Sequence, residues 1–283
     1  MERLFGFGHT ILSDLPIPGA LPCGDDGQVC APVLSVDLTE ARDCPQDEIY
    51  RRDGDALLFA PPGVGLYRCR ATGIKVTPQP GSDHAELSAL LIATALPAVQ
   101  WLQRNFMAHA AGIVLPGSAS AIAITGNSGS GKSTAAAALL ARGARLLGDD
   151  SLRIAPVRGD WMASGLPGGL YLPDGDRPYR CFAPVPVSRA VAEARLGAIF
   201  VLGQRQAAAS IRRVDGVAAL AQVLAMQHRP RVPTILGQRH GTLQLAAGIA
   251  RSLPVFVWER RSGAIALEQQ ELDMLQVCCG EER

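Results

Sequence analysis

The sequence predicts an α/β fold in which a phosphate-loop core follows a small β-rich N-terminal module. Three observations predict it. Short apolar runs separated by turn signals fill the first 82 residues. The second half alternates strand-like and helix-like apolar patterns. Between them, a glycine-rich loop joins a buried strand to a helix. We therefore expect a module over residues 1–82 and a larger domain over residues 83–283 that opens with a leading helix.

The N-terminal module is expected to hold several short strands. Residues 56–60, 65–70 and 73–76 are short apolar runs. The turn signals Pro61-Pro62-Gly63 and Pro80-Gly81 separate or follow them. Such edges of sheets can receive extended peptides.

A long apolar helix should follow, from about residue 84 to 105, with Ser82 or Asp83 as its N-cap. Pro97 should kink this helix or split it in two. Its most apolar part, residues 87–102, falls short of the roughly 20 apolar residues that a membrane span needs. We expect a buried helix.

The core is expected to alternate strands and helices. Strands are predicted over residues 110–115, 120–125, 145–148, 198–202 and 255–258, and helices over residues 133–141, 217–226 and 242–252. Gly143 closes the first of these helices, and the strand after it ends at Asp149-Asp150.

Composition excludes several classes of protein. With 48% hydrophobic and 19% charged residues, the chain can bury a core and is not of the disordered class. A net charge of +1 gives no electrostatic reason to expect nucleic acid as a partner. The seven cysteines are scattered and form no CxxC pair, so neither a disulfide framework nor a zinc site is expected. No secretion signal is recognised, and we expect a cytoplasmic protein without membrane attachment.

The glycine-rich loop carries the strongest functional signal. It reads Gly126-Asn127-Ser128-Gly129-Ser130-Gly131-Lys132-Ser133, with Thr134 next, and it matches G-x-x-x-x-G-K-[ST]. Glycines let backbone N–H groups close around phosphate oxygens, and the following helix points its positive end at them. We expect this stretch to bind ATP, with Lys132 at the β- and γ-phosphates and Ser133 on Mg²⁺. Thr134 adds a second hydroxyl, although its position also suits an exposed helix face.

Lysine usage adds to this signal. Only two of the 27 basic residues are lysines, Lys75 and Lys132. A compact ammonium can do what the wide planar fork of arginine cannot. The alternative is a glycine-rich turn with a solvated lysine. A dinucleotide-binding loop would need a third glycine that is missing here.

Two aspartates, Asp149 and Asp150, follow Lys132 by 17 and 18 residues. One helix, one turn and one strand fill that gap, so we expect the pair at the end of a strand next to the loop. One carboxylate can bind Mg²⁺ while the other accepts the proton of an attacking hydroxyl. We expect Asp149 to be the base and Asp150 to lie on the metal side. The alternative interpretation is that one of the two aspartates caps a turn or the segment that follows.

Weaker candidates surround this set. His109 precedes the loop strand, where it is either a core histidine or a catalytic one. A cation for the developing phosphoryl charge could come from a further group of basic residues, and every member of that group also suits a solvated surface: His228, Arg229, Arg231, Arg239 and His240. Glu193 is a candidate second Mg²⁺ ligand, and residues 177–180 are candidates to contact an acidic peptide.

These motifs resemble the HPr serine kinase/phosphorylase family. The matching residues are Gly126 to Ser133, Arg142-Gly143, Asp149-Asp150 and the upstream His109-Ala110-Ala111-Gly112. The aspartate placement is also similar to that of ATP-dependent phosphoenolpyruvate carboxykinases. Within this group the chain resembles most the kinases of lasso-peptide biosynthesis, through the segment from Phe7 to Pro18 and through residues 195–202 and 253–256.

The resemblance implies ATP-dependent phosphorylation of a serine hydroxyl, and in the lasso branch this is the C-terminal serine of a precursor peptide. It also implies that His109 lies beside the catalytic aspartate and orients it. The chain departs from the family at Asn127, where aspartate is usual, and in lacking a Pro-Gly-Arg-Asn-like arginine loop. Residues 193–197 match a further family segment only loosely. These departures weigh against HPr itself as the substrate and against the reverse reaction.

We therefore predict an ATP- and Mg²⁺-dependent peptide serine kinase in which Lys132, Asp149 and His109 are the catalytic residues. Three alternatives stay open: an HPr-type protein kinase, a small-metabolite kinase, and a nucleotide-dependent regulatory module that hydrolyses slowly. A homo-oligomer is compatible with the sequence.

Overall fold

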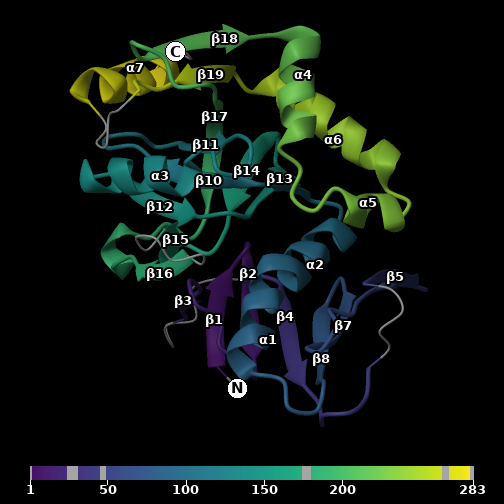
Figure 1. The fold of residues 1–283 in the computed structure, drawn as a ribbon. Helices are drawn as coiled ribbons and strands as arrows, with labels where there is room; N and C mark the ends of the chain where they lie inside the picture. Colours follow the sequence, from purple (N-terminus) through teal and green to yellow (C-terminus); the bar gives the residue numbers. More distant parts are fainter. Residues whose placement is uncertain (1, 24–30, 45–48, 174–179, 263–267, 281–283) are drawn as a thin grey trace.

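Two large β-sheets with a helical segment between them make up most of the protein (Figure 1). The structure is a computed structural model that describes residues 2–23, 31–44, 49–173, 180–262 and 268–280. The fold is mixed α/β, as predicted.

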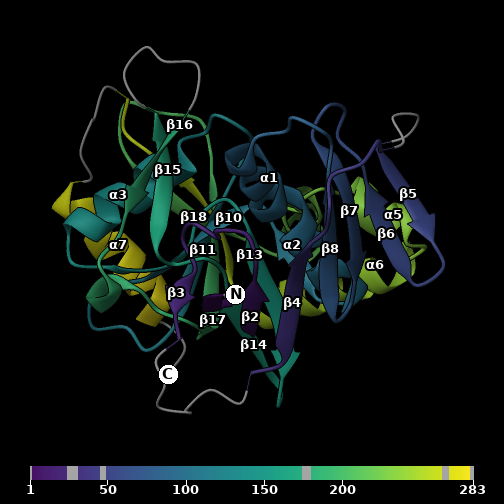
Figure 2. The ribbon, with the colours of Figure 1, turned by 90° about the horizontal axis from the view of Figure 1, so that it is seen from below.

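The first sheet comes entirely from the N-terminal residues. Its eight strands are β1 (Glu2–Gly6), β2 (His9–Ser13), β3 (Leu21–Pro22), β4 (Val33–Leu38), β5 (Tyr50–Asp53), β6 (Ala56–Phe59), β7 (Gly65–Arg70) and β8 (Gly73–Pro78). They run in the order β3-β1-β2-β4-β8-β7-β6-β5. The predicted strands at β6, β7 and β8 are confirmed, and in β7 alternate residues such as Tyr67 and Cys69 are buried. Figure 2 shows this sheet from β3 to β5, with α1 and α2 beside its centre.

The connecting helix is divided, as Pro97 predicted. Helix α1 (His84–Leu90) begins at Asp83, whose carboxylate accepts the Ala85 N–H at 3.0 Å. A π-helical turn (Leu91–Ala95) follows, and then α2 (Leu96–Leu102) with Pro97 in its first turn. Proline has no N–H to give to the carbonyl four residues earlier, at Ala93. Arg229 Nε donates to that carbonyl instead, at 3.4 Å.

This helical segment is long and apolar enough to cross a membrane by length and composition alone. However, 67% of its most apolar window is buried inside the protein. Helix α2 contacts β7 and β8 of the first sheet and β9 of the second. That is the packing of a core helix.

The second sheet has nine strands: β9 (Phe106–Ala108), β10 (Ala110–Val114), β11 (Ala121–Thr125), β12 (Arg145–Gly148), β13 (Leu152–Val157), β14 (Asp160–Ser164), β17 (Ala194–Leu202), β18 (Ser210–Val214) and β19 (Val255–Glu259). Strand β17 pairs in parallel with β11 and β19 and antiparallel with β14, so it is the branch point of the sheet. A separate hairpin joins β15 (Gly169–Pro173) to β16 (Arg180–Pro184).

The described residues contain five more α-helices: α3 (Lys132–Ala141), α4 (Gly216–Ala225), α5 (Arg231–Ile235), α6 (Arg239–Ser252) and α7 (Gln269–Gly280). Helix α3 packs on β10, β11 and β12 of the second sheet, whereas α5 contacts α2, α6 and β5 of the first sheet. Helix α3 ends in a Schellman motif, since Gly143 N–H donates to Leu140 O and Ala144 N–H to Leu139 O. The predicted closure at Gly143, where φ is +92°, is confirmed.

The predicted alternation of strand and helix is wrong for residues 145–214. Strands β12 to β18 follow one another there, and the described residues contain only a 3₁₀ turn (Val187–Arg189) among them. At the β13–β14 connection the reason is local: Arg158 and Gly159 both have positive φ and make a tight antiparallel turn. The second sheet is therefore mixed rather than parallel.

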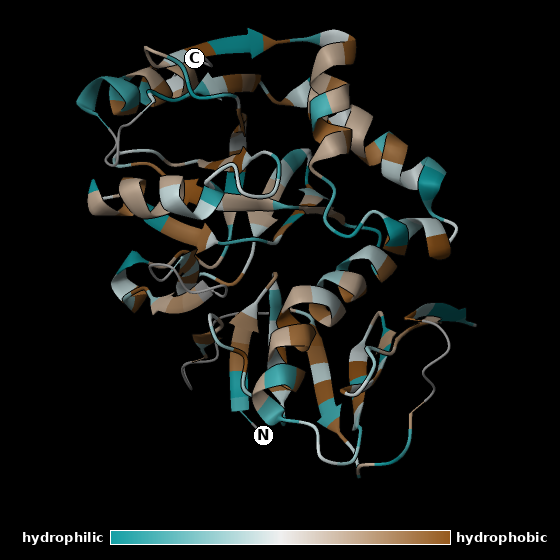
Figure 3. Cartoon of the chain, in the orientation of Figure 1, coloured by the Kyte–Doolittle hydropathy of each residue, from teal (hydrophilic) through white to brown (hydrophobic). Residues whose placement is uncertain are grey.

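One hydrophobic core serves both sheets. It includes Phe7 from the first sheet, Leu91 from the connecting helix, and Phe106, Ile199 and Ile249 from the rest of the chain. In Figure 3 the strands beside α2 are largely apolar, whereas the outer strand β18 is mostly hydrophilic. A second cluster lies beneath α3 and α7.

Candidate active site

The glycine-rich loop connects β11, which is buried along its whole length, to the first residue of α3. Gly126, Gly129 and Gly131 have φ values of +146°, +78° and +88°, which L side chains rarely adopt. A Cβ on Gly131 would also lie 2.9 Å from Arg260 Nη2. The loop thus needs glycine for conformation and for space, and it presents the start of a ten-residue helix to whatever it binds.

Lys132 lies against the loop itself. Its Nζ donates to Gly126 O at 3.0 Å and to Asn127 O at 3.2 Å, and the residue is 7% exposed. Residues 127–129 of the loop are exposed, and Thr134 points to solvent on α3. Thr134 was expected to be either a second hydroxyl ligand or an exposed helix-face residue, and its position is that of the exposed helix face.

Ser133 and Asp149 meet beside the loop. Ser133 Oγ donates to Asp149 Oδ1 at 3.1 Å, and Tyr171 N–H donates to Asp149 Oδ2 at 3.1 Å. Burial raises the pKa of the Asp149 carboxyl, and these two hydrogen bonds partly offset that rise.

Sheet order explains this meeting. The strand that carries the aspartates, β12, is not adjacent to β11, because β10 lies between them. Both pair antiparallel with β10, so β11 and β12 run in the same direction and end at the same edge. Their following residues therefore meet across the end of β10.

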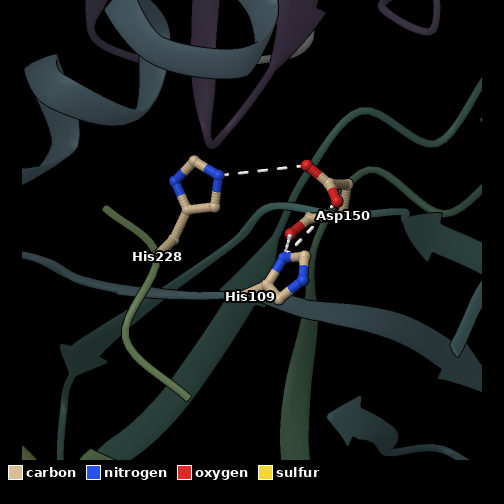
Figure 4. Close-up of side chains that lie close together, drawn as sticks. All are labelled: His109, Asp150 and His228. Atoms are coloured by element: carbon tan, nitrogen blue, oxygen red, sulfur yellow. Dashed lines mark hydrogen bonds and ion pairs between the residues drawn. The ribbon is translucent and has the colours of Figure 1, made fainter. Parts of the chain in front are cut away.

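Asp150 points elsewhere and contacts His109 (Figure 4). His109 Nδ1 lies 3.0 Å from the Asp150 carbonyl oxygen and 3.4 Å from its Oδ1. Asp150 has φ +66°, a conformation that turns its side chain away from that of Asp149. His109 is held by its own backbone, which donates to Met226 O at 2.6 Å and accepts from Thr125 Oγ1 at 2.9 Å.

This geometry differs from the expected one. His109 was expected to support Asp149, but it contacts Asp150, and Ser133 bonds Asp149 rather than Asp150. The two carboxylates do not converge on one point, because the left-handed backbone at Asp150 separates them.

His228 faces the other side of the Asp150 carboxylate, with Nε2 3.9 Å from Oδ2 (Figure 4). It is 5% exposed, and burial lowers its pKa to about 4 despite the raising effect of Asp150. Burial therefore disfavours the charged form of the ring, which argues against His228 as the cation expected from the sequence. Its backbone is fixed by Met107 O at 2.9 Å and by the Trp101 indole N–H at 3.0 Å.

Two sets of atoms could hold a metal ion. Ser133 Oγ and Asp149 Oδ1 are hard oxygen ligands of the kind that Mg²⁺ takes. His109, Asp150 and His228 offer nitrogen and oxygen atoms within 4.8 Å of one another, a set that suits transition metals. In the second set, His109 Nδ1 is already engaged with the Asp150 carbonyl.

Arg260 is a loop contact that sequence reasoning missed. Its guanidinium donates to the Ser130 carbonyl and, at 3.4 Å, to Gly131 O, and it lies over the Trp258 ring. Arg260 is 9% exposed at the end of β19. It is one of 25 arginines, more than 120 residues beyond the loop, so its sequence position carries no signal.

The other predicted residues lie outside this set. Arg231, Arg239 and His240 are exposed near α5 and α6, and Arg229 is exposed with its Nε on Ala93 O. Glu193 pairs with Arg153 at 3.1 Å, so its carboxylate serves an ion pair. Residues 177–179 and the side chain of Arg180 lie outside the described part of the chain.

No protein-family model matches the sequence, and no curated protein sequence matches it. Among solved structures, the chain is similar to the Hpr(Ser) kinase/phosphatase from Coxiella burnetii. The two share 14% sequence identity over 60% of this chain and 92% of that chain, with a TM-score of 0.36.

Proposed function

We propose that the protein is a phosphotransferase that uses ATP and Mg²⁺ to phosphorylate a serine hydroxyl of a peptide. The observation that carries this proposal is that the two adjacent aspartates have different partners beside the loop. Ser133 and Asp149 form an oxygen pair on the loop side, while Asp150 is held separately by His109. A donor site and a proton-accepting site therefore lie next to each other.

The donor side fits a nucleoside triphosphate with its metal. The glycine conformations let the loop turn backbone N–H groups towards phosphate oxygens, although the Ser130 N–H donates to Asn127 O within the loop. Lys132 adds a positive charge at the same loop. Ser133 Oγ and Asp149 Oδ1 would hold Mg²⁺. Bound Mg²⁺ would neutralise charge on the phosphates. In this proposal Asp149 is on the metal side, the reverse of the role expected from the sequence.

The acceptor side is Asp150. Its side chain is 37% exposed, and His109 fixes its position through the Asp150 carbonyl and carboxylate. The acceptor oxygen attacks the γ-phosphorus, and the new O–P bond forms as the bond to the β–γ bridging oxygen breaks. The hydroxyl proton passes to Asp150, and ADP leaves. His109 acts through Asp150 and is a positioning residue.

The identity of the acceptor follows the family that the sequence resembles. We propose the C-terminal serine of a precursor peptide, and ATP as donor implies a cytoplasmic location. An HPr-type protein, a small metabolite, or regulatory nucleotide binding without transfer are the alternatives that the experiment separates.

The experiment supplies labelled ATP, Mg²⁺ and peptides that end in Ser or in Ala. We expect label only on the Ser peptides. Lys132→Ala should abolish transfer, whereas Lys75→Ala, which changes the other lysine, exposed on β8, should not. ATP hydrolysis without peptide labelling would contradict the peptide acceptor. Unchanged turnover in Lys132→Ala would contradict the phosphate-loop assignment itself.

A further inference from the structure

A cavity of about 250 Å³ is lined in part by Asp149 and Asp150, and no residue of the glycine loop is in its lining. Beside the aspartates, its lining includes Phe7 and Pro18 from the N-terminal region, Ile92 of the helical segment, and Phe182 of β16. The cavity is smaller than the roughly 300–1,000 Å³ typical of pockets for whole small-molecule ligands. It has room for one or two side chains.

The N-terminal contribution is fixed by backbone hydrogen bonds. Phe7 N–H donates to Gly165 O at 2.9 Å, and Gly168 N–H donates to Gly19 O at 2.7 Å. Phe7 has φ +51°, and only 2% of it is exposed. These bonds tie Phe7 and Gly19 to the segment between β14 and β15, so this part of the lining is held by the backbone.

The lining is mostly apolar apart from Asp149, Asp150 and Ser151. Leu166, Phe182 and Tyr171 add to its hydrophobic surface, and the rings of Tyr171 and Phe182 lie 5.4 Å apart. Among the described residues that line the cavity, the charged side chains are Asp149 and Asp150 alone. An anionic group placed there would face two carboxylates, whereas an apolar group gains by leaving water.

A second cavity, of about 340 Å³, adjoins the loop at Gly126 and Asn127. Its lining is polar and includes Arg212, Gln222 and Glu259. The two cavities therefore differ in chemistry, and the apolar one is next to Asp150, the residue that takes the acceptor's proton in the function proposed above.

We propose that the apolar cavity is the acceptor site, and that it binds the apolar side chain next to the reacting serine of a peptide. This inference rests on the proposed function. With that side chain buried between Phe7, Ile92 and Phe182, the neighbouring hydroxyl lies at Asp150. The first residues of the chain thus select the substrate, which gives the N-terminal sheet a function in recognition.

The test uses three matched peptides that end in Leu-Ser, Asp-Ser or Lys-Ser, and it measures kcat/KM for each together with the KM for ATP. We expect the Leu-Ser peptide to exceed the other two by at least about tenfold, because burying a leucine side chain is worth more than a factor of ten in binding. Ala89→Trp, at an exposed helix position that lines the cavity, should raise the KM for the Leu-Ser peptide by about tenfold or more and leave the KM for ATP unchanged.

Ala85→Trp is the matched control, since Ala85 is exposed on the same helix and does not line the cavity. Ala89→Leu, with a smaller side chain, should give an intermediate effect, and circular dichroism checks that each variant folds. Equal rates for the three peptides, or equal KM values for Ala89→Trp and Ala85→Trp, would overturn the acceptor site and leave the proposed function intact. If the wild-type protein does not bind ATP at all, the proposed function itself is overturned.

Discussion

A 3.1 Å hydrogen bond joins Ser133 to Asp149. Ser133 is in the first turn of α3, whereas Asp149 directly follows β12. The bond exists because β11 and β12 both run antiparallel to β10 and finish at one edge of the sheet. The neighbouring carboxylate, Asp150, contacts His109 instead. Asp149 and Asp150 therefore have different partners, and we expect their mutations to affect different steps.

Asp150→Asn and Asp149→Asn should be distinguishable by kinetics. If the proposed function holds, Asp150→Asn removes the proton acceptor, and we expect kcat to fall by about 10²–10⁴ while Mg²⁺–ATP binding is retained. Asp149→Asn should weaken ATP binding only when Mg²⁺ is present. Calorimetry with a non-hydrolysable ATP analogue, with and without Mg²⁺, checks both. The opposite pattern would restore Asp149 as the base.

Asp149→Asn should also stabilise the protein at neutral pH. Burial raises the pKa of Asp149 in the folded state above its unfolded value of about 3.9. As pH rises from the unfolded pKa to the folded pKa, Asp149 loses its proton first in the unfolded chain, so the free energy of unfolding falls. Above the folded pKa the full cost of burying the charged carboxylate applies. Asparagine carries no such penalty. We expect the Tm to rise by roughly 2–4 °C at pH 7 and the gain to shrink towards pH 4.

Differential scanning fluorimetry at pH 4 and pH 7 measures this effect. Asp160→Asn is the control, because Asp160 is exposed and its distance to Arg195 is 3.8 Å. A Tm for Asp149→Asn that is lower than wild type at pH 7 would show that the hydrogen bonds outweigh the burial of the charge.

His228 should make the protein less stable in mild acid. Burial lowers its pKa to about 4, against 6.5 for an ordinary histidine, and the groups that face it are Asp150, His109 and Arg229. Between pH 6.5 and pH 4 the unfolded chain takes up a proton that the folded ring does not. The free energy of unfolding therefore falls as pH falls through this window.

In His228→Gln this part of the pH dependence should be absent. Urea denaturation at pH 7 and pH 5 gives the change for each protein, and the exposed His84, as His84→Gln, is the control. If His228→Gln and wild type lose the same stability between the two pH values, His228 is not the group responsible.

Gly131→Ala should weaken both the fold and nucleotide binding. The left-handed conformation alone costs an alanine roughly 1–2 kcal/mol, and here the new Cβ would also lie 2.9 Å from Arg260 Nη2. Gly117 has a similar φ of +76° with nothing within 4 Å of its Cβ position. Gly117→Ala therefore isolates the backbone cost. We expect only Gly131→Ala to raise the Kd for ATP, and equal Kd values would mean that Arg260 adapts.

Much of the local structure is predictable because its signals are contiguous. The glycine loop lies between a buried strand and a helix, and the strand at residues 145–148 ends at the aspartates, as the patterns of apolar residues, Gly143 and the turn residues indicate. Pro97 likewise marks the division of the connecting helix. Each of these follows from residues within one or two turns of one another.

The roles within the site were decided by tertiary structure. Whether Asp149 or Asp150 meets Ser133 depends on sheet order and on the φ of Asp150, which no neighbouring residue specifies. Arg260 reaches the loop from the position just after β19, and the pKa of His228 is lowered because the fold buries its ring. The apolar cavity needs Phe7 and Phe182, which are far apart in the sequence, to line the same space. Sequence by itself determined which local elements form, because their hydrogen bonds and apolar faces are short-range. Long-range packing alone decided which side chains meet, because that depends on strand order and burial.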